Sequence, residues 1–263
     1  PTTDYISSEI IRSRIDEGHV QDLGVDDDIN MEALIALDPE IVMAYTMTND
    51  YGQFNRMQEA DINVVINAEY LEEHPLGRAE WIKFAGALFG LPERADSVFR
   101  AIEANYLKAK TLATKDDYQP TVLSGIVYGD SWYLPGGKNY AAKLFQDARL
   151  NYIWRSDTSS GFMPLSFESV YNTAREANLW IGVGSFETLE ELRKSDERYA
   201  QFNAFTEMKV FSFNKRMGAK GGSEYLELGY LRPDLILKDL IKIGHPKLLP
   251  DYETFFFFKL PAE

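Results

Sequence analysis

The chain has 263 residues, a formal net charge of −14 and no cysteine. This acidic balance argues against a nucleic-acid or anionic-membrane partner, because phosphate groups are bound through clustered Lys and Arg. The lack of cysteine excludes disulfides, thiol nucleophiles and thiolate metal ligands. No stretch of the sequence approaches the roughly 20 uninterrupted apolar residues that cross a bilayer, so we expect a globular protein.

The N-terminal part of the chain alternates between helix-like and strand-like patterns, which is typical of an α/β lobe. Asn30 is a good helix N-cap, and the nearly continuous apolar run at 41–45 suits a buried parallel strand. We expect, in chain order, helix 6–16, strand 20–23, helix 31–37, strand 41–45, helix 51–59, strand 64–66 and helix 80–89.

Residues 91–114 are predicted to form one long amphipathic helix near the middle of the chain. Pro92 suits its first turn, and apolar residues recur along it with the spacing of a single helical stripe. From Glu93 to Ala113 such a helix spans about 31 Å. Because α/β patterns lie on both sides of it, we expect this helix to join two lobes. An ordinary helix packed on one sheet is the alternative.

A second α/β series follows the long helix. We expect strand 121–126, helix 140–148, helix 167–175, strand 179–182, helix 189–194, strand 210–213 and helix 233–243. The predicted fold is therefore α/β, with two Rossmann-like lobes joined by a single long backbone helix and a ligand cleft between the lobes. The predicted boundaries are an N-terminal lobe over 1–90, the helix over 91–114 and a C-terminal lobe over 115–263. With only two clear strands, the N-terminal lobe is expected to lack its leading strand.

The sequence lacks the templates of catalysis. His19, His74 and His245 do not have the spacing of a metal site, and no G-x-S-x-G motif marks a nucleophilic serine. The glycine pairs at 136–137 and 221–222 match neither the P-loop nor the dinucleotide fingerprint. We therefore predict no enzyme, no catalytic residue, no resident metal and no cofactor. A metal-dependent chelatase-like enzyme and an adhesion or sensing module are the alternatives, because fold alone does not decide function.

Aromatic residues gather in a predicted loop over 128–140, directly after the first strand of the second series. Because open α/β sheets bind ligands at the carboxyl ends of their strands, Trp132 and Tyr133 are candidate walls of a ligand site. Tyr45 lies at the corresponding carboxyl end of strand 41–45. The alternative is a turn whose aromatic rings cap the core.

Basic residues gather in the loop 214–222, directly after strand 210–213. In so acidic a chain, Lys215 and Arg216 are candidates to neutralise an anionic ligand, and Arg155 is a further candidate. A solvated basic loop is the alternative.

Several motifs in this order resemble those of ABC-importer substrate-binding proteins, in the class with a rigid helix between the lobes. Two segments resemble the iron-complex branch of that class, HPLGRAEWIKFAGALFG at 74–90 and YLPGGKNY at 133–140. The resemblance covers nearly the whole chain through the remaining motifs, DLGVDDDINMEALIALDPEIVMAY (22–45), E-x-x-Y-x-x-x-K (103–110), LSFESVY (165–171) and RPDLILKDL (232–240).

The resemblance implies a protein that captures a small metal chelate between its lobes and delivers it to an ABC permease. The basic loop favours a ferric siderophore. Haem and cobalamin are the alternatives, with Tyr45 or Tyr133 as an axial ligand of haem iron. The resemblance also implies docking on the permease through one exposed carboxylate per lobe. These are Glu32 and Glu227, with Glu224 as a rival of Glu227.

The same resemblance implies where the protein works. We expect a monomer in the periplasm or at the cell surface, held at the membrane only through a lipid anchor. A signal peptide and a lipid-bearing cysteine are then expected upstream of Pro1.

Overall fold

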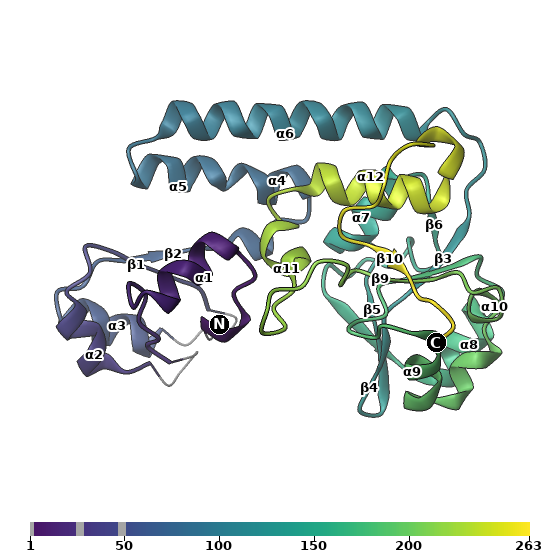
Figure 1. Ribbon diagram of the computed structural model, residues 1–263, viewed down its shortest axis with the longest axis horizontal. Helices are drawn as coiled ribbons and strands as arrows, with labels where there is room; N and C mark the ends of the chain where they lie inside the picture. Colours follow the sequence, from purple (N-terminus) through teal and green to yellow (C-terminus); the bar gives the residue numbers. More distant parts are fainter. Residues whose placement is uncertain (1–2, 25–28, 47–50) are drawn as a thin grey trace. The chain divides into compact units, whose positions relative to one another are not determined.

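The computed structural model describes residues 3–24, 29–46 and 51–263. The contacts divide the chain into two compact units, each described here by itself. Unit 1 comprises Pro1–Leu71 and Met217–Ser223, and unit 2 comprises Glu72–Arg216 and Glu224–Glu263. Both units combine helices with parallel strands, so the predicted α/β class is confirmed (Figure 1).

Unit 1 contains a small parallel sheet and one apolar cluster. In the sheet, β1 (Val42–Ala44) pairs with β2 (Val64–Ile66). The buried side chains of the cluster are Leu34, Phe54, Met57 and Ile62. The helices described in this unit are η1 (Thr3–Tyr5), α1 (Glu9–Asp16), α2 (Met31–Leu37), α3 (Gly52–Glu59) and η3 (Glu69–Leu71).

Near the start of unit 1, the predicted helix cap at Asn30 is present and the strand predicted at 20–23 is not. Asn30 caps α2 as expected, because its side chain accepts a hydrogen bond from the backbone N–H of Ala33 at 3.0 Å. The strand expected at 20–23 is wrong, since these residues form no strand. Val20 is exposed and Leu23 is only partly buried, so the segment has no buried face with which to join a sheet.

A short loop from the C-terminal half of the chain, 217–223, packs within unit 1. Met217 and Ser223 form an antiparallel bridge, and Lys220 Nζ lies 2.6 Å from Asp4 Oδ1. A Cβ on Gly222 would lie 1.8 Å from the carbonyl oxygen of Tyr5, so only glycine fits this approach. Sequence periodicity carries no signal for such a contact between distant segments.

The long helix predicted at 91–114 is confirmed in unit 2 as α6 (Pro92–Ala113). Its 22 residues span about 33 Å at 1.5 Å per residue. It packs against α5 (Ile82–Leu88) and α12 (Pro233–Gly244), both of which run below it in Figure 1.

The helices before α6 also belong to unit 2. The helix expected at 80–89 is in fact two helices, α4 (Pro75–Glu80) and α5, which meet at Trp81. Gly86 of α5 lies so close to α6 that a Cβ would be 2.3 Å from the Cβ of Ala95. Because α4 and α5 pack on α6, the unit begins at Glu72, whereas the sequence places the lobe boundary after residue 90.

The main sheet of unit 2 has five strands in the order β10–β9–β8–β3–β6. Neighbouring strands are parallel apart from β10, which is antiparallel to β9. From β3 the chain proceeds to β6 on one side and then to β8 and β9 on the other, so a switch point lies between β3 and β8. The strands are β3 (Thr121–Ser124), β6 (Asn151–Tyr152), β8 (Leu179–Ile181), β9 (Val210–Ser212) and β10 (Phe258–Lys259).

A second sheet, antiparallel and of order β4–β5–β7, lies where the sequence predicts an aromatic loop. Its strands are β4 (Ile126–Tyr128), β5 (Ser131–Pro135) and β7 (Phe162–Leu165). The prediction of a loop over 128–140 is wrong, because β5 occupies its centre. Side chains of β5 alternate as in any strand, with Trp132 and Leu134 buried and Tyr133 exposed.

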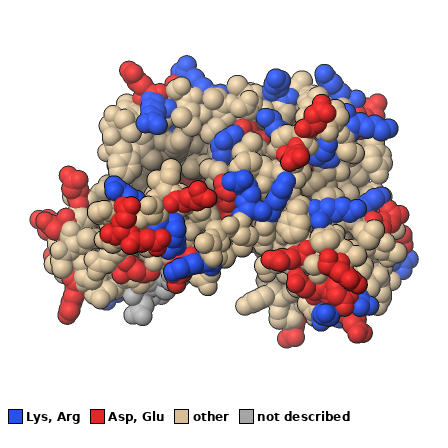
Figure 2. Space-filling view, in the orientation of Figure 1, with Lys and Arg blue, Asp and Glu red and all other residues tan. Residues whose placement is uncertain are grey.

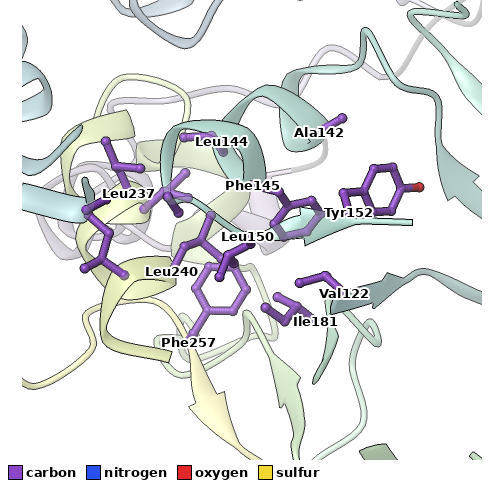
Figure 3. Close-up of a cluster of buried hydrophobic side chains, with 14 of the residues drawn as sticks. Val122, Ala142, Leu144, Phe145, Leu150, Tyr152, Ile181, Leu237, Leu240 and Phe257 are labelled. Carbon is purple, nitrogen blue, oxygen red and sulfur yellow. The ribbon is translucent and has the colours of Figure 1, made fainter. Parts of the chain in front are cut away.

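Two apolar clusters form the core of unit 2. Figure 3 shows the first, in which side chains from α7 and α12 meet those of β3 and β8. The second surrounds the stacked indoles of Trp132 and Trp180, whose ring centroids are 5.3 Å apart. The remaining helices are α7 (Tyr140–Asp147), α8 (Phe167–Ala174), α9 (Leu189–Ser195), η4 (Glu197–Gln201), α10 (Asn203–Thr206), α11 (Glu224–Leu228) and η5 (Pro246–Leu248).

The surface of the chain carries both signs of charge. Figure 2 shows Asp and Glu side chains interspersed with Lys and Arg over the face in view. In the part of the chain that the structure describes, no helix is both long and apolar enough to span a membrane.

A buried hydrogen bond connects α6 to α7. The hydroxyl of Tyr106, which has no exposed surface, donates to Asp147 at 2.6 Å, and Lys110 Nζ lies 2.8 Å from the same carboxylate. We expect Tyr106→Phe to lower the free energy of unfolding by about 1–2 kcal/mol, because a buried carboxylate loses one donor. Urea unfolding measures this loss, and Tyr118→Phe, at an exposed tyrosine, is the matched control. Equal stability of the two variants would contradict the assigned role.

Candidate ligand-binding site

A pocket of about 230 Å³ lies at the carboxyl edge of the main sheet of unit 2. We call it the sheet-edge pocket. It lies at the switch point, because Ser124 and Gly125 at the end of β3 and Ile181 and Gly182 at the end of β8 all line it. Gly125 has a φ of +79°, and a Cβ there would lie 1.9 Å from the carbonyl oxygen of Tyr133, so glycine is required.

The lining of the sheet-edge pocket is mainly apolar and aromatic. Arg78 is the one charged side chain among the described residues that line it. The volume is below the roughly 300–1,000 Å³ of typical small-molecule sites. The other lining residues are Pro135, Asn139, Tyr140, Ala141, Leu144, Phe145, Phe162, Phe213, Tyr225, Leu226, Tyr230, Ile236, Leu240 and Phe257.

Arg78 lies against two adjacent tyrosine rings. Its guanidinium carbon lies 4.5 Å from the ring centroid of Tyr140 and 4.8 Å from that of Tyr230. Its Nε donates a hydrogen bond to the carbonyl oxygen of Glu72 at 3.1 Å. These two cation–π contacts and the hydrogen bond restrict the side chain, so the guanidinium is preorganised at the pocket.

The position of Arg78 follows from the way α4 begins. Pro75 occupies the first turn, where its fixed φ suits a helix and its missing N–H is not needed. The ring nitrogen Nδ1 of His74 accepts a hydrogen bond from the backbone N–H of Leu76 at 3.2 Å. This cap fixes the start of the helix, and Arg78 lies in its last turn.

Two tyrosines of the pocket, Tyr140 and Tyr225, remain neutral. Burial raises the pKa of Tyr140 and of Tyr225 above the ordinary value of a phenol, so neither offers a negative charge to Arg78. The ring of Tyr225 stacks on Phe213 with centroids 4.6 Å apart. The pocket therefore combines aromatic walls with a guanidinium, which suits a bulky organic ligand with an anionic edge.

The structure does not place the predicted aromatic walls in this pocket. Trp132 has no exposed surface, its indole N–H donates to the carbonyl oxygen of Ser124 at 3.0 Å, and its ring stacks on Trp180. The prediction that Trp132 contacts the ligand is therefore wrong. Tyr133, on the opposite face of β5, is exposed and lies edge-on to Tyr128 outside the pocket lining.

The predicted basic residues also lie outside the sheet-edge pocket. Lys215 donates a hydrogen bond to the carbonyl oxygen of Thr254, and Arg216 forms an ion pair with Glu224. Arg216 is therefore already paired with a carboxylate, whereas Lys215 contacts a neutral carbonyl oxygen. Arg155 lines a different pocket, described below.

The remaining predicted residues are exposed. Tyr45 in unit 1 is 53% exposed, and its ring lies edge-on to Tyr70. Glu32 lies in the first turn of α2, and Glu227 lies on α11. The rival Glu224 is engaged in the ion pair with Arg216 described above.

Arg78 and Tyr230 are the residues that the sequence interpretation missed. Taken alone, Arg78 resembles an anchor of its own helix, and Tyr230 belongs to none of the ligand motifs. The available signal was the pair Gly125 and Gly182, which end the two central strands and mark the carboxyl edge. In the described ranges of the chain, no group of three or more His, Asp or Glu side chains is placed to hold a metal ion.

A family model described as periplasmic binding protein matches residues 5–217. The chain belongs to this family. The matched region includes β1 to β9 and most of the sheet-edge pocket. Proteins of this family bind and hand over substrates rather than convert them, so the prediction that this periplasmic binding protein is not an enzyme is confirmed.

This periplasmic binding protein is similar in sequence to two uncharacterised lipoproteins of Methanocaldococcus jannaschii. One is 28% identical over 256 residues, covering 96% of this chain and 59% of the relative. The other is 25% identical over 263 residues, covering 95% of this chain and 64% of the relative. The chain therefore spans less than two thirds of the length of either lipoprotein.

Solved structures show the same fold. A periplasmic haem-binding protein from Pseudomonas aeruginosa has a TM-score of 0.68 at 15% identity, covering 94% of this chain and 86% of that one. The haem-binding protein RhuT from Roseiflexus has a TM-score of 0.67 at 17% identity, covering 92% and 89%. The siderophore-binding protein FhuD from Vibrio cholerae, bound to Fe³⁺–Desferal, has a TM-score of 0.61 at 17% identity, covering 86% and 83%. At these identities the likeness establishes the fold alone. The resemblance to substrate-binding proteins of ABC importers is therefore confirmed for the fold.

Proposed function

We propose that this chain is an extracytoplasmic substrate-binding protein that captures an iron complex and delivers it to an ABC importer. The observation that carries the proposal is the guanidinium of Arg78, held against the rings of Tyr140 and Tyr230 at the switch point of the main sheet. Membership of the periplasmic binding protein family supports the transport role, and the names of similar solved structures support an iron complex. The lipoprotein names of its relatives support a lipid anchor at the membrane.

A ferric siderophore is the cargo that we favour. Because the sheet-edge pocket holds only about 230 Å³, it receives one apolar or aromatic arm of a chelate. Arg78 then pairs with an anionic oxygen of the ligand, as guanidinium groups do with carboxylates and similar planar anions. Haem is the second candidate, favoured by the aromatic lining of the pocket.

Calorimetric titration tests this proposal. The chain is titrated with a panel of ferric siderophores, the same siderophores without iron, haem and cobalamin. We expect saturable binding of one iron complex and much weaker binding of its iron-free form, since the iron organises the chelate and reduces the ordering cost of binding. Binding of no iron complex in the panel by the folded chain would contradict the proposal, and tight binding of haem alone would select the second candidate.

Glu32 and Glu227 are the proposed contacts with the permease. Both carboxylates are exposed, on α2 and α11 respectively. We expect Glu32→Gln and Glu227→Gln each to lower iron uptake by about tenfold, because each removes one charge pair with the importer, and to leave ligand affinity unchanged. Uptake of the radiolabelled iron complex by cells with the cognate importer measures the effect. Glu253→Gln, at an exposed carboxylate, is the control.

A loss of ligand affinity in the same variants would place Glu32 or Glu227 in the binding site instead. Unchanged uptake in both variants would contradict the docking assignment.

A further inference from the structure

A second pocket of about 670 Å³ lies beside β6, the edge strand of the main sheet of unit 2. We call it the basic pocket. It is distinct from the sheet-edge pocket, because the two share no lining residue. Helix α7 separates them, with Leu144 and Phe145 lining the sheet-edge pocket and Gln146 and Asp147 lining the basic pocket.

The charged side chains of the basic pocket are three cations and one carboxylate, Lys110, Arg149, Arg155 and Asp147. Asp147 is already paired with Lys110 at 2.8 Å. In the described part of the chain, neither arginine has a carboxylate within ion-pair distance. The nearest polar partners of Arg155 are the side-chain oxygen of Asn151 and a backbone carbonyl oxygen. Two positive charges therefore remain uncompensated at this pocket, in a protein with a net charge of −14.

Arg149 is unusual in both its side chain and its backbone. Its Nε is buried and has no hydrogen-bond partner in the structure, although buried polar atoms are nearly always paired. Its φ is +60°, directly after the C-cap of α7, in a conformation that normally favours glycine. An arginine at a strained position, with its buried Nε unpaired, points to a role outside the fold itself.

We propose that the basic pocket binds a small soluble oxyanion carrying a phosphate group, held by the guanidinium groups of Arg149 and Arg155. A phosphate dianion balances both charges, and each guanidinium matches its oxygens with two parallel donors. The pocket volume also accommodates a small organic substituent on the phosphate. This site is independent of the proposed iron cargo, since it involves no residue of the sheet-edge pocket.

Calorimetric titration with inorganic phosphate and with pyrophosphate, at constant ionic strength maintained with sodium chloride, tests the proposal. We expect saturable binding by the unmodified chain. Arg149→Gln and Arg155→Gln are each expected to weaken it at least about tenfold, because each removes a charge-assisted pair. Arg94→Gln, which makes the same charge change at an exposed position of α6, is expected to bind like the unmodified chain.

A thermal scan supplies an independent readout. Pyrophosphate is expected to raise the Tm of the unmodified chain and of Arg94→Gln, and to leave the Tm of Arg149→Gln unchanged. The proposal is overturned if no saturable binding occurs up to millimolar concentrations, or if Arg149→Gln binds as tightly as Arg94→Gln. It is also overturned if Arg149→Gln merely lowers Tm without changing affinity, which would show a purely structural role. The chain is also mixed with vesicles that contain phosphatidylglycerol. Binding to these vesicles without binding of phosphate or pyrophosphate would likewise overturn the proposal of a soluble ligand.

Discussion

Replacing Arg78 with glutamine is expected to lower the affinity for the iron complex by about 10- to 100-fold. A hydrogen bond to a charged group contributes about 1.5–3 kcal/mol, and this range corresponds to that change in Kd. The effect is expected to be large because Arg78 is already positioned by Tyr140 and Tyr230, so its side chain loses little conformational freedom on binding. Calorimetric titration with the ligand that the panel identifies measures the change.

One further variant separates the charge of Arg78 from its shape, and a second serves as a control. Arg78→Lys keeps the charge but loses the planar fork and its contact with the tyrosine rings, so we expect an intermediate affinity. Arg94→Gln removes an exposed arginine of α6 and is expected to have no effect. Wild-type affinity in Arg78→Gln, with a normal Tm, would show that the ligand does not contact this guanidinium.

Asp239→Asn is expected to lower the free energy of unfolding by about 1–3 kcal/mol, the usual cost of leaving a buried hydrogen-bonding group unsatisfied. Asp239 lies on α12 with no exposed surface. Its carboxylate accepts hydrogen bonds from the Tyr252 hydroxyl at 2.7 Å and from the backbone N–H groups of Phe255, Phe256 and Phe257 at 2.7, 2.6 and 3.1 Å. An asparagine would direct its own NH₂ group at some of these donors and leave them unsatisfied.

The loss in Asp239→Asn is measured by urea unfolding. Asp251→Asn makes the same charge change at an exposed position after η5. Its free energy of unfolding is expected to stay within about 0.5 kcal/mol of that of the unmodified chain. Because the Asp239 contacts also position Phe257, which lines the sheet-edge pocket, weaker ligand binding is expected to accompany the loss of stability. A variant as stable as the control would show that these hydrogen bonds contribute little.

Local patterns in the sequence were enough to predict most helices of this chain. The stripe of α6 and the cap at Asn30 depend on residues within a few turns of one another, so they can be recognised without tertiary information. The aromatic segment around Trp132 was misread, because the glycines after Pro135 indicate a turn while the residues before them alternate as a strand.

The site itself was predictable only in its location. The carboxyl-edge rule points correctly to the ends of β3 and β8, where Gly125 and Gly182 lie. The rule does not say which distant side chains reach that edge. Arg78 arrives there from α4, and Tyr230 follows α11, through packing that no sequence period encodes.

The central claim is that the iron complex occupies the sheet-edge pocket of unit 2. Hydrogen–deuterium exchange of the chain with and without its saturating iron complex tests this claim most directly. We expect slower exchange at the ends of β3 and β8, at the start of α7 and in residues 225–230, all of which contribute residues to the lining of that pocket. Saturating ligand that leaves exchange in these four segments unchanged would contradict it.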